Sequence, residues 1–200
     1  MSSVTPPKAD PVPRMRVEDR KELVLTAATE VFGEHGYVGT TTDAVARAAG
    51  VSQPYVVRMF GTKEALFLAV LERALGRLLD AFESAIDAGT DDLPQRLGAA
   101  YGELLTDRGL LLSLMHAFVL GSDPTIGAAA RRGFLEVYAL LRRRAGFSVE
   151  EARDFLAQGM LLNTMVGIRM AAEDADDARE LVECVAPTKA ELLGTLARAR

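Results

Sequence analysis

Apolar residues recur at intervals of three and four along most of the chain, which is the spacing of a helix with one buried face. Val, Ile and Tyr never alternate with polar residues over the length of a strand, so the pattern predicts an all-α protein. Helices are expected over residues 17 or 19–34, 42–49, 53–60, 62–88, 93–106, 109–120, 124–145, 148–172, 178–185 and 187–200.

Residues 40–62 carry the signals of two short helices joined by a tight turn. Thr41 can cap the first helix, and Gly50, directly after an apolar run, can take the left-handed conformation that ends it. Ser52 is a second N-cap, and Pro54 falls in the first turn of the next helix, where its missing N–H costs nothing. This arrangement is typical of the helix-turn-helix, whose second helix enters a DNA major groove.

The helix expected over residues 53–60 has one side that packs and one side that is free. The packing side carries Val56, Met59 and Phe60. The residues expected to reach bases are Gln53, Pro54, Tyr55, Val57 and Arg58. Among these types, an arginine suits guanine, a glutamine suits adenine, and a valine suits the methyl group of thymine.

Phosphate contacts are expected from polar residues around the same two helices. These residues are Thr40, Thr41, Ser52 and Lys63. Lys63 is expected to be an exposed cation at the start of the following helix. Three of these residues have an alternative role: Thr41 and Ser52 serve only as helix caps, and Tyr55 only covers the turn.

A resemblance to a known family extends over residues 24–66 in unbroken register. It is carried by Ala27-Ala28, Val31-Phe32, Gly36-Tyr37, Thr40-Thr41, Val45-Ala46, Ala49-Gly50-Val51-Ser52, Phe60 and Lys63-Glu64-Ala65-Leu66. In these positions the chain resembles the DNA-binding domain of the TetR family of bacterial transcriptional regulators. It departs from the family at Val57, where an aromatic residue is usual, and at Met59, where Tyr or His is frequent.

The resemblance implies a ligand-responsive repressor that acts as a homodimer. In the family, the helix that follows the DNA-binding domain changes its tilt when an effector binds, and here that helix is expected over residues 62–88. The last two long helices of each family member form a four-helix bundle with those of a second subunit. The chain is therefore expected to have a DNA-binding domain over residues 17–67 and an effector-binding and dimerisation domain over residues 68–200.

Small residues in the stretch 159–170 independently favour close approach of a second helix. The expected dimer interface comprises Gly159, Leu162, Val166, Gly167 and Met170. A twofold dimer would place two recognition helices on one frame, which suits an inverted-repeat operator in double-stranded DNA with half-sites about 34 Å apart or a multiple of that.

A pocket for a small apolar effector is expected in the C-terminal domain, lined by aromatic and methionine side chains with few polar groups. The expected lining residues are Phe67, Tyr101, Met115, His116, Phe118, Phe134, Tyr138 and Asn163. Asn163 and His116 are the polar groups expected to face inward, although a place in the core is an equal alternative for His116. No cofactor is expected.

The net charge of −5 is unusual for a DNA-binding protein, but the charges are unevenly distributed. Residues 1–68 carry eight basic and eight acidic side chains, which leaves fifteen of the 23 basic and twenty of the 28 acidic side chains to the rest of the chain. A neutral domain with its cations on one face can bind phosphates. The weak electrostatic field of the whole protein, however, argues against tight binding to DNA of any sequence.

Residues 1–16 are polar and rich in proline, so a disordered arm and no signal peptide are expected there. A solvated tail without function is the first interpretation, and a basic arm whose Lys8, Arg14 and Arg16 contact DNA is the alternative. The apolar runs are too short or too interrupted to span a membrane. The sole cysteine, Cys184, cannot form an internal disulfide, which favours the cytoplasm, with a redox-sensing thiol as the alternative.

The residues offer no constellation for catalysis, since the two histidines are far apart and neither metal-ligand spacing nor a phosphate loop is present. The function predicted is therefore transcriptional regulation and not an enzymatic activity. An all-helical small-molecule carrier or sensor with a vestigial DNA-binding domain is the alternative. Arg58 and Lys63 argue against this alternative, whereas Val57 and the acidic balance favour it.

Overall fold

The structure is a computed structural model, and it describes residues 16–89 and 91–185 of the 200-residue chain. Regular structure in these residues is helical throughout, which confirms the all-α prediction. The helices are α1 (Val17–Gly39), α2 (Thr42–Ala48), α3 (Gln53–Phe60), α4 (Lys63–Asp87), α5 (Leu93–Leu104), α6 (Arg108–Val119), α7 (Pro124–Arg143), α8 (Val149–Gly167), a 3-10 helix (Met170–Ala172) and α9 (Asp176–Val185). The N-terminal arm and the helix expected over residues 187–200 lie outside the described residues.

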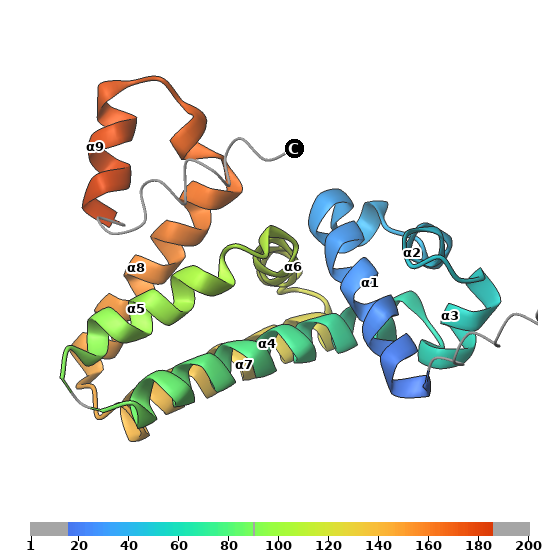
Figure 1. Cartoon of the computed structure of the whole chain (residues 1–200), viewed down its shortest axis with the longest axis horizontal. Helices are drawn as coiled ribbons and strands as arrows, with labels where there is room; N and C mark the ends of the chain where they lie inside the picture. The colour runs from blue at the N-terminus through green and yellow to red at the C-terminus, as the bar shows by residue number, and fades with distance from the viewer. Residues whose placement is uncertain (1–15, 90, 186–200) are drawn as a thin grey trace, which may run out of the picture.

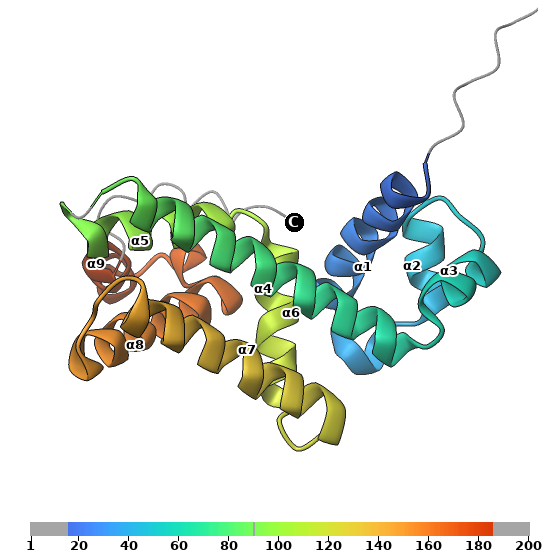
Figure 2. The same cartoon turned by 90° about the horizontal axis from the view of Figure 1, so that it is seen from below.

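Figure 1 shows α1, α2 and α3 grouped at one end of the molecule, with α5, α8 and α9 at the other end. α4 runs from the first group to the second, and α7 packs along it. The perpendicular view in Figure 2 shows α6 crossing between the two groups. The molecule is thus an N-terminal helix-turn-helix domain that α4 joins to a larger helical domain.

An aromatic cluster fills the core of the N-terminal domain. The ring centroid of Phe67, in the second turn of α4, lies 4.7 Å from that of Phe32 and 5.1 Å from that of Tyr37, both in α1. Val45 of α2 and Val56 of α3 are fully buried in the same core. The first turns of α4 therefore belong to the N-terminal core, so packing as well as the chain joins the two domains.

A second core lies between α4, α5, α7 and α8. Phe82 of α4 is buried there, and its ring meets Phe155 of α8 edge to face at 5.8 Å and Tyr101 of α5 at 6.2 Å. Ser148 begins α8 with a capping box, as its sequence predicts, because its side chain accepts from the Glu151 N–H and Glu151 accepts from the Ser148 N–H.

Where α1 and α6 cross, their main chains are in direct contact. A Cβ atom built on Gly33 would lie 2.7 Å from the Cα of Gly109, and one built on Gly109 would lie 3.0 Å from the carbonyl oxygen of Thr29. The hydroxyl of Ser113 in α6 donates to the same carbonyl at 3.3 Å. The first helix was expected to end at residue 34, but α1 continues to a kink at Gly36 (φ 68°), and Gly33 permits the crossing.

Two arginines one turn apart connect α4 to its neighbours on either side. Arg73 Nε donates at 2.7 Å to the carboxylate of Glu22 in α1. Arg77 Nη1 donates at 2.7 Å to Asp107, and the other carboxylate oxygen of Asp107 accepts from the Leu110 N–H at the start of α6. α4 is therefore joined to both helices of the crossing pair.

α8 ends earlier than predicted, at Gly167 and not near residue 172. Arg169 then takes a left-handed conformation (φ 56°) before the 3-10 helix. Across the described ranges, no single helix has both the length and the apolar character to cross a membrane; only α6 and α7 taken together do, and they are bent by 117°. The same residues contain no cluster of His, Cys, Asp or Glu that could hold a metal ion.

Candidate DNA-binding surface and effector cavity

The turn between α2 and α3 forms as its residues predict. Thr41 caps α2 by accepting from the Ala44 N–H at 3.1 Å. Gly50 adopts φ 64°, a left-handed conformation that costs glycine little, and the Val51 N–H closes the corner by donating to the Ala46 carbonyl at 3.0 Å. This local geometry fixes the direction in which α3 leaves the turn.

α3 has the two sides that its sequence predicts. Val56 is fully buried, and Met59 and Phe60 are partly buried against the N-terminal core. The opposite side, with Pro54, Val57 and Arg58, is exposed. The helix therefore presents one short, unpacked face to the outside.

A cationic cluster lies at the side of this face. The guanidinium of Arg58 lies over the ring of Tyr55 at 5.1 Å, and that of Arg20, from α1, lies over the same ring at 5.9 Å. In the part of the chain that the structure describes, neither guanidinium forms an ion pair. Sequence reasoning missed Arg20, because only folding brings α1 beside α3.

The residues expected to contact phosphates differ in how accessible they are. Thr41 and Ser52 are exposed, and Ser52 makes no capping hydrogen bond with its side chain. Thr40 is fully buried, and its hydroxyl donates to the Gly36 carbonyl at 2.7 Å. The expectation that the Thr40 hydroxyl is presented to a phosphate is therefore wrong, because this hydroxyl closes the end of α1.

Lys63 and Gln53 are both partly buried. The Lys63 ammonium donates to the Tyr37 carbonyl at 3.0 Å and lies 4.6 Å from the centre of the Tyr37 ring. It is therefore not the fully exposed cation that was predicted, although two of its three protons remain to be donated. Gln53 Nε2 donates to the hydroxyl of Thr42 in α2 at 3.3 Å.

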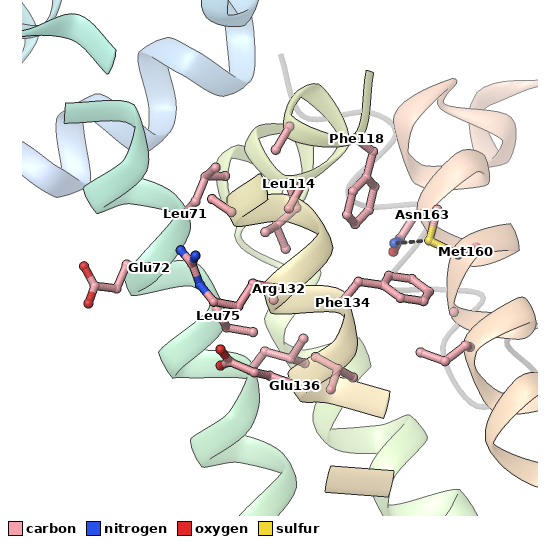
Figure 3. Close-up of a pocket in the computed structure, with 18 of the residues that line it drawn as sticks. Leu71, Glu72, Leu75, Leu114, Phe118, Arg132, Phe134, Glu136, Met160 and Asn163 are labelled. Atoms are coloured by element: carbon pink, nitrogen blue, oxygen red, sulfur yellow. Dashed lines mark hydrogen bonds between the residues drawn. The ribbon is translucent and has the colours of Figure 1, made fainter. Parts of the chain in front are cut away.

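A cavity of about 390 Å³ opens between α4, α5, α6, α7 and α8. Its wall is mainly apolar, and the polar residues in it are Glu72, Tyr101, Arg132, Glu136 and Asn163. Figure 3 shows the three charged side chains on one side of the cavity and Asn163 on the other, close to Phe118 and Phe134.

Four of the eight predicted pocket residues line this cavity: Tyr101, Phe118, Phe134 and Asn163. The other four do not. Phe67 belongs to the N-terminal core, and Tyr138 packs in the second core. Met115 lies against Gly167, and the imidazole of His116 lies against Gly36 of α1 and not at the cavity wall.

Sequence reasoning missed most of the walls contributed by α4 and α7. These residues are Leu68, Leu71, Glu72, Leu75, Leu78, Phe82, Ala129, Ala130, Arg132, Gly133, Glu136 and Val137. The broad apolar side of α4 was visible in the sequence, but which part of it meets another helix and which part faces a cavity depends on how the helices are placed.

A neutral hydrogen-bonded pair is part of the cavity wall. The Tyr101 hydroxyl donates to Oδ1 of Asn163, and both residues line the cavity. Burial raises the pKa of Tyr101 to about 12, although the hydrogen bond to Asn163 acts in the opposite direction. The phenol is therefore uncharged at neutral pH.

The residues expected at a dimer interface lie largely within the subunit. Gly159 lines the cavity, Val166 is buried, and Gly167 packs against Met115. Leu162 and Met170 are partly buried against a small core beside α9. The exposed apolar residues of this stretch are instead Leu161 (41% exposed) and Ile168 (61% exposed).

The sequence is similar to known regulators, most clearly in the N-terminal domain. Residues 24–70 match the model of bacterial regulatory proteins of the tetR family. The transcriptional activator FasR of Mycolicibacterium smegmatis is 29% identical over 175 residues, which is 83% of this chain and 74% of FasR. The regulator BetI of Rhizobium meliloti is 35% identical over 78 residues, 38% of each chain.

Solved structures share the fold over almost the whole chain. A TetR-like transcriptional regulator from a Rhodococcus species superposes with a TM-score of 0.60 at 22% identity, covering 92% of this chain and 96% of the other. The fatty acid degradation regulator FadR of Bacillus halodurans superposes with a TM-score of 0.58 at 21% identity, covering 90% and 99%. At these identities the likeness extends to the fold alone.

Proposed function

Because the chain belongs to the TetR family of bacterial transcriptional regulators, we propose that it binds an inverted-repeat operator as a homodimer and represses transcription until a small, mainly apolar effector binds. The observation that carries this proposal is the exposed face of α3 beside the cluster of Arg20, Tyr55 and Arg58. A short exposed helix with unpaired cations at its side suits a major groove bordered by phosphates.

Base reading falls to the exposed residues of α3 in this proposal. Arg58 donates to guanine, and Val57 contacts a thymine methyl group. Gln53 reaches adenine once its side chain gives up the hydrogen bond to the Thr42 hydroxyl. Pro54 and Tyr55 complete the surface next to the bases.

Phosphate contacts set the register of the two strands without reading their sequence. We assign them to Thr41, Ser52, Lys63 and Arg20. Thr41 keeps a proton to donate while its oxygen caps α2, and Lys63 keeps two. Arg20 joins this set because its guanidinium lies beside Tyr55 without an acidic partner in the described residues.

Dimerisation is proposed to use two exposed apolar residues, Leu161 of α8 and Ile168 directly after the end of α8. A single N-terminal domain offers few contacts, so a specific complex needs two such domains on one frame. A twofold pair of subunits would place its two α3 helices about 34 Å apart, or a multiple of that, on the operator.

Effector binding is proposed to reach the DNA-binding domain through α6 as well as α4. Leu114, Ala117 and Phe118 of α6 form part of the cavity wall, while the N-terminal half of α6 lies on the main chain of α1. A ligand that displaces α6 also displaces α1, because no side chain separates the two main chains at Gly33 and Gly109 and could change its rotamer to accommodate the movement. In this proposal the effector binds more tightly to the conformation of the dimer in which the distance between the two α3 helices does not match the operator.

Activation is a second candidate role, and one finding favours it. FasR, which is similar to this chain over 175 residues, is a transcriptional activator. The two roles differ in the position of the operator, because a repressor blocks a promoter and an activator binds upstream of it. A promoter–reporter fusion measured with and without the protein separates them: loss of the protein raises expression under repression and lowers it under activation.

The test of the proposed function is a selection of bound genomic fragments with the purified protein, repeated at rising salt concentrations. Recovery of an inverted repeat, with affinity that falls steeply with salt, is the expected result. Recovery of single half-sites would contradict the dimer. Recovery of no fragment, with and without extracts that contain small molecules, would contradict DNA binding and favour a carrier with a vestigial N-terminal domain.

A further inference from the structure

We propose that the cavity takes a neutral, largely apolar molecule that carries a carbonyl oxygen, and that the side-chain amide of Asn163 donates to this oxygen. The inference rests on the proposed effector-responsive function and specifies the chemical class of the effector. Esters, lactones, ketones and amides belong to this class, whereas free carboxylic acids and simple hydrocarbons do not.

The hydrogen bonds of Asn163 are the first argument. Asn163 is 4% exposed, and its Oδ1 accepts from the Tyr101 hydroxyl. Its Nδ2 has the thioether sulfur of Met160 as its partner, at 3.8 Å. Buried N–H groups are normally paired with oxygen, and a thioether is only a weak acceptor. Asn163 therefore holds a strong donor against a weak acceptor at the wall of the cavity.

The Tyr101 hydroxyl sets the orientation of this amide. Because it donates to Oδ1, the amide nitrogen is the atom that points to Met160, as Figure 3 shows. A carbonyl oxygen that entered between Asn163 and Met160 would replace the sulfur contact with a stronger hydrogen bond. The pair would then have each of its polar atoms bonded to oxygen.

The distribution of charge is the second argument. The charged wall residues Glu72, Arg132 and Glu136 are exposed and belong to α4 and α7. The wall residues of α5, α6 and α8 include no charged side chain, and Tyr101 is neutral there. A carboxylate that reached Asn163 would lose its hydration without meeting a cation, which is costly, whereas a neutral carbonyl needs only the one donor.

The size and lining of the cavity complete the description. A volume of about 390 Å³ is within the usual range for a small-molecule site of roughly 300–1,000 Å³. Phe118 and Phe134 meet edge to face at 6.2 Å, and both line the cavity together with Asn163. An apolar body would cover these rings while its carbonyl reaches the amide.

The experiment is calorimetric titration of the full-length protein at neutral pH with three straight-chain probes of equal carbon number: a methyl ester, the free carboxylate and the alkane. Several chain lengths are compared. The ester is expected to bind roughly tenfold more tightly than either of the others, the value of one well-formed hydrogen bond. Equal or tighter binding of the carboxylate overturns the inference, and so does the absence of binding by every ester.

Two variants of α8 assign the hydrogen bond to its donor. Asn163→Leu is expected to bind the alkane as well as the wild type does but to lose the preference for the ester. Thr164→Val, at the next residue, changes an exposed hydroxyl that bonds the Met160 carbonyl, and it is expected to keep that preference. An unchanged preference in Asn163→Leu overturns the assignment.

A measurement on the wild-type protein gives the same test if Asn163→Leu does not fold. The infrared carbonyl band of a ¹³C-labelled ester moves to lower frequency when the oxygen accepts a hydrogen bond. A bound ester is expected to show this shift relative to the same ester in hexane, and an unshifted band overturns the inference.

An operator-binding assay separates this inference from the proposed function. If esters bind through Asn163 but leave operator affinity unchanged, the ligand class stands and the ligand-responsive regulation fails. If carboxylates release the operator and esters do not, the regulation stands and the ligand class fails.

Discussion

The Cα atom of Gly109 lies 2.7 Å from the point where a Cβ of Gly33 would be, so α1 of the DNA-binding domain and α6 of the cavity wall touch through their main chains. Helices that cross in this way without intervening side chains have no rotamers with which to absorb a shift. The contact of Gly33 with Gly109 therefore connects a helix of the cavity wall to the N-terminal domain directly, beside the connection through α4.

Replacement of Gly33 by alanine tests this contact. The added methyl group must push α1 and α6 apart, so Gly33→Ala is expected to lower the free energy of unfolding by roughly 1–3 kcal/mol and to weaken the response of DNA binding to effector. Gly76→Ala is the matched control, since a Cβ on that residue of α4 would meet no atom within 4 Å. The control should gain about 0.5–1 kcal/mol from the better helix former. Denaturant unfolding of both variants gives the comparison, and equal stability changes would contradict the crossing.

Loss of the Arg58 side chain should affect one position of the operator. Arg58→Ala is expected to cost about 1–3 kcal/mol in operator affinity and to relax the preference at a single base pair. Arg20→Ala should instead weaken binding to all sequences alike and reduce the slope of affinity against salt. Arg153→Ala, an exposed residue of α8 remote from α3, serves as the control. Selection from a randomised operator pool measures all three variants. An unchanged base preference in Arg58→Ala would show that Arg58 does not read a base.

A charge at Ile168, directly after the end of α8, should separate the subunits. Ile168→Asp is expected to yield a folded monomer in sedimentation, because this side chain is 61% exposed within the subunit and adds little to its core. Val119→Asp, at a residue of α6 that is 83% exposed, is the control and should remain dimeric. An Ile168→Asp protein that still sediments as a dimer would place the interface elsewhere. A charge at Val166 would be a poorer test, since that residue is buried in the subunit's own core.

The raised pKa of Tyr101 predicts a loss of stability in alkali. The ordinary pKa of tyrosine is 10.0, and that of Tyr101 in the folded protein is about 12. Below pH 10 the phenol is neutral in both states; between pH 10 and 12 only the unfolded chain releases the proton, so the free energy of unfolding falls as pH rises. The expected loss across this window is of the order of 2–3 kcal/mol. Tyr101→Phe should remove most of this dependence, which urea unfolding at pH 9 to 12 would measure; an equal slope in both proteins would contradict the shift.

The sequence predicted most securely those parts of the fold that depend on neighbouring residues. α3 begins at Gln53 and ends at Phe60, as expected: Pro54 stands in its first turn and Gly61 (φ 80°) follows its last residue, although the Ser52 side chain makes no capping hydrogen bond. The exposed face of α3 followed from the same short stretch. The contact between Gly33 and Gly109 was not predicted, because the two glycines are far apart in the sequence and only folding brings them together.

The cavity was predicted only in part, for a similar reason. Tyr101, Phe118, Phe134 and Asn163 were identified from their chemistry, and they do line it. Phe67 has the same chemistry but lies in the N-terminal core, because the first turns of α4 pack there. Helical periodicity shows which side of a helix is buried and does not show whether that side meets another helix or an opening.

Arg73 and Arg77 give α4 two ionic attachments on adjacent turns, one to α1 and one to the capping residue of α6. All four side chains retain some contact with solvent, so both attachments weaken as ionic strength rises. Salt would thus loosen the protein internally at the same time as it weakens the phosphate contacts. If the proposed effector response is correct, its strength should therefore depend on ionic strength, even at a constant effector concentration.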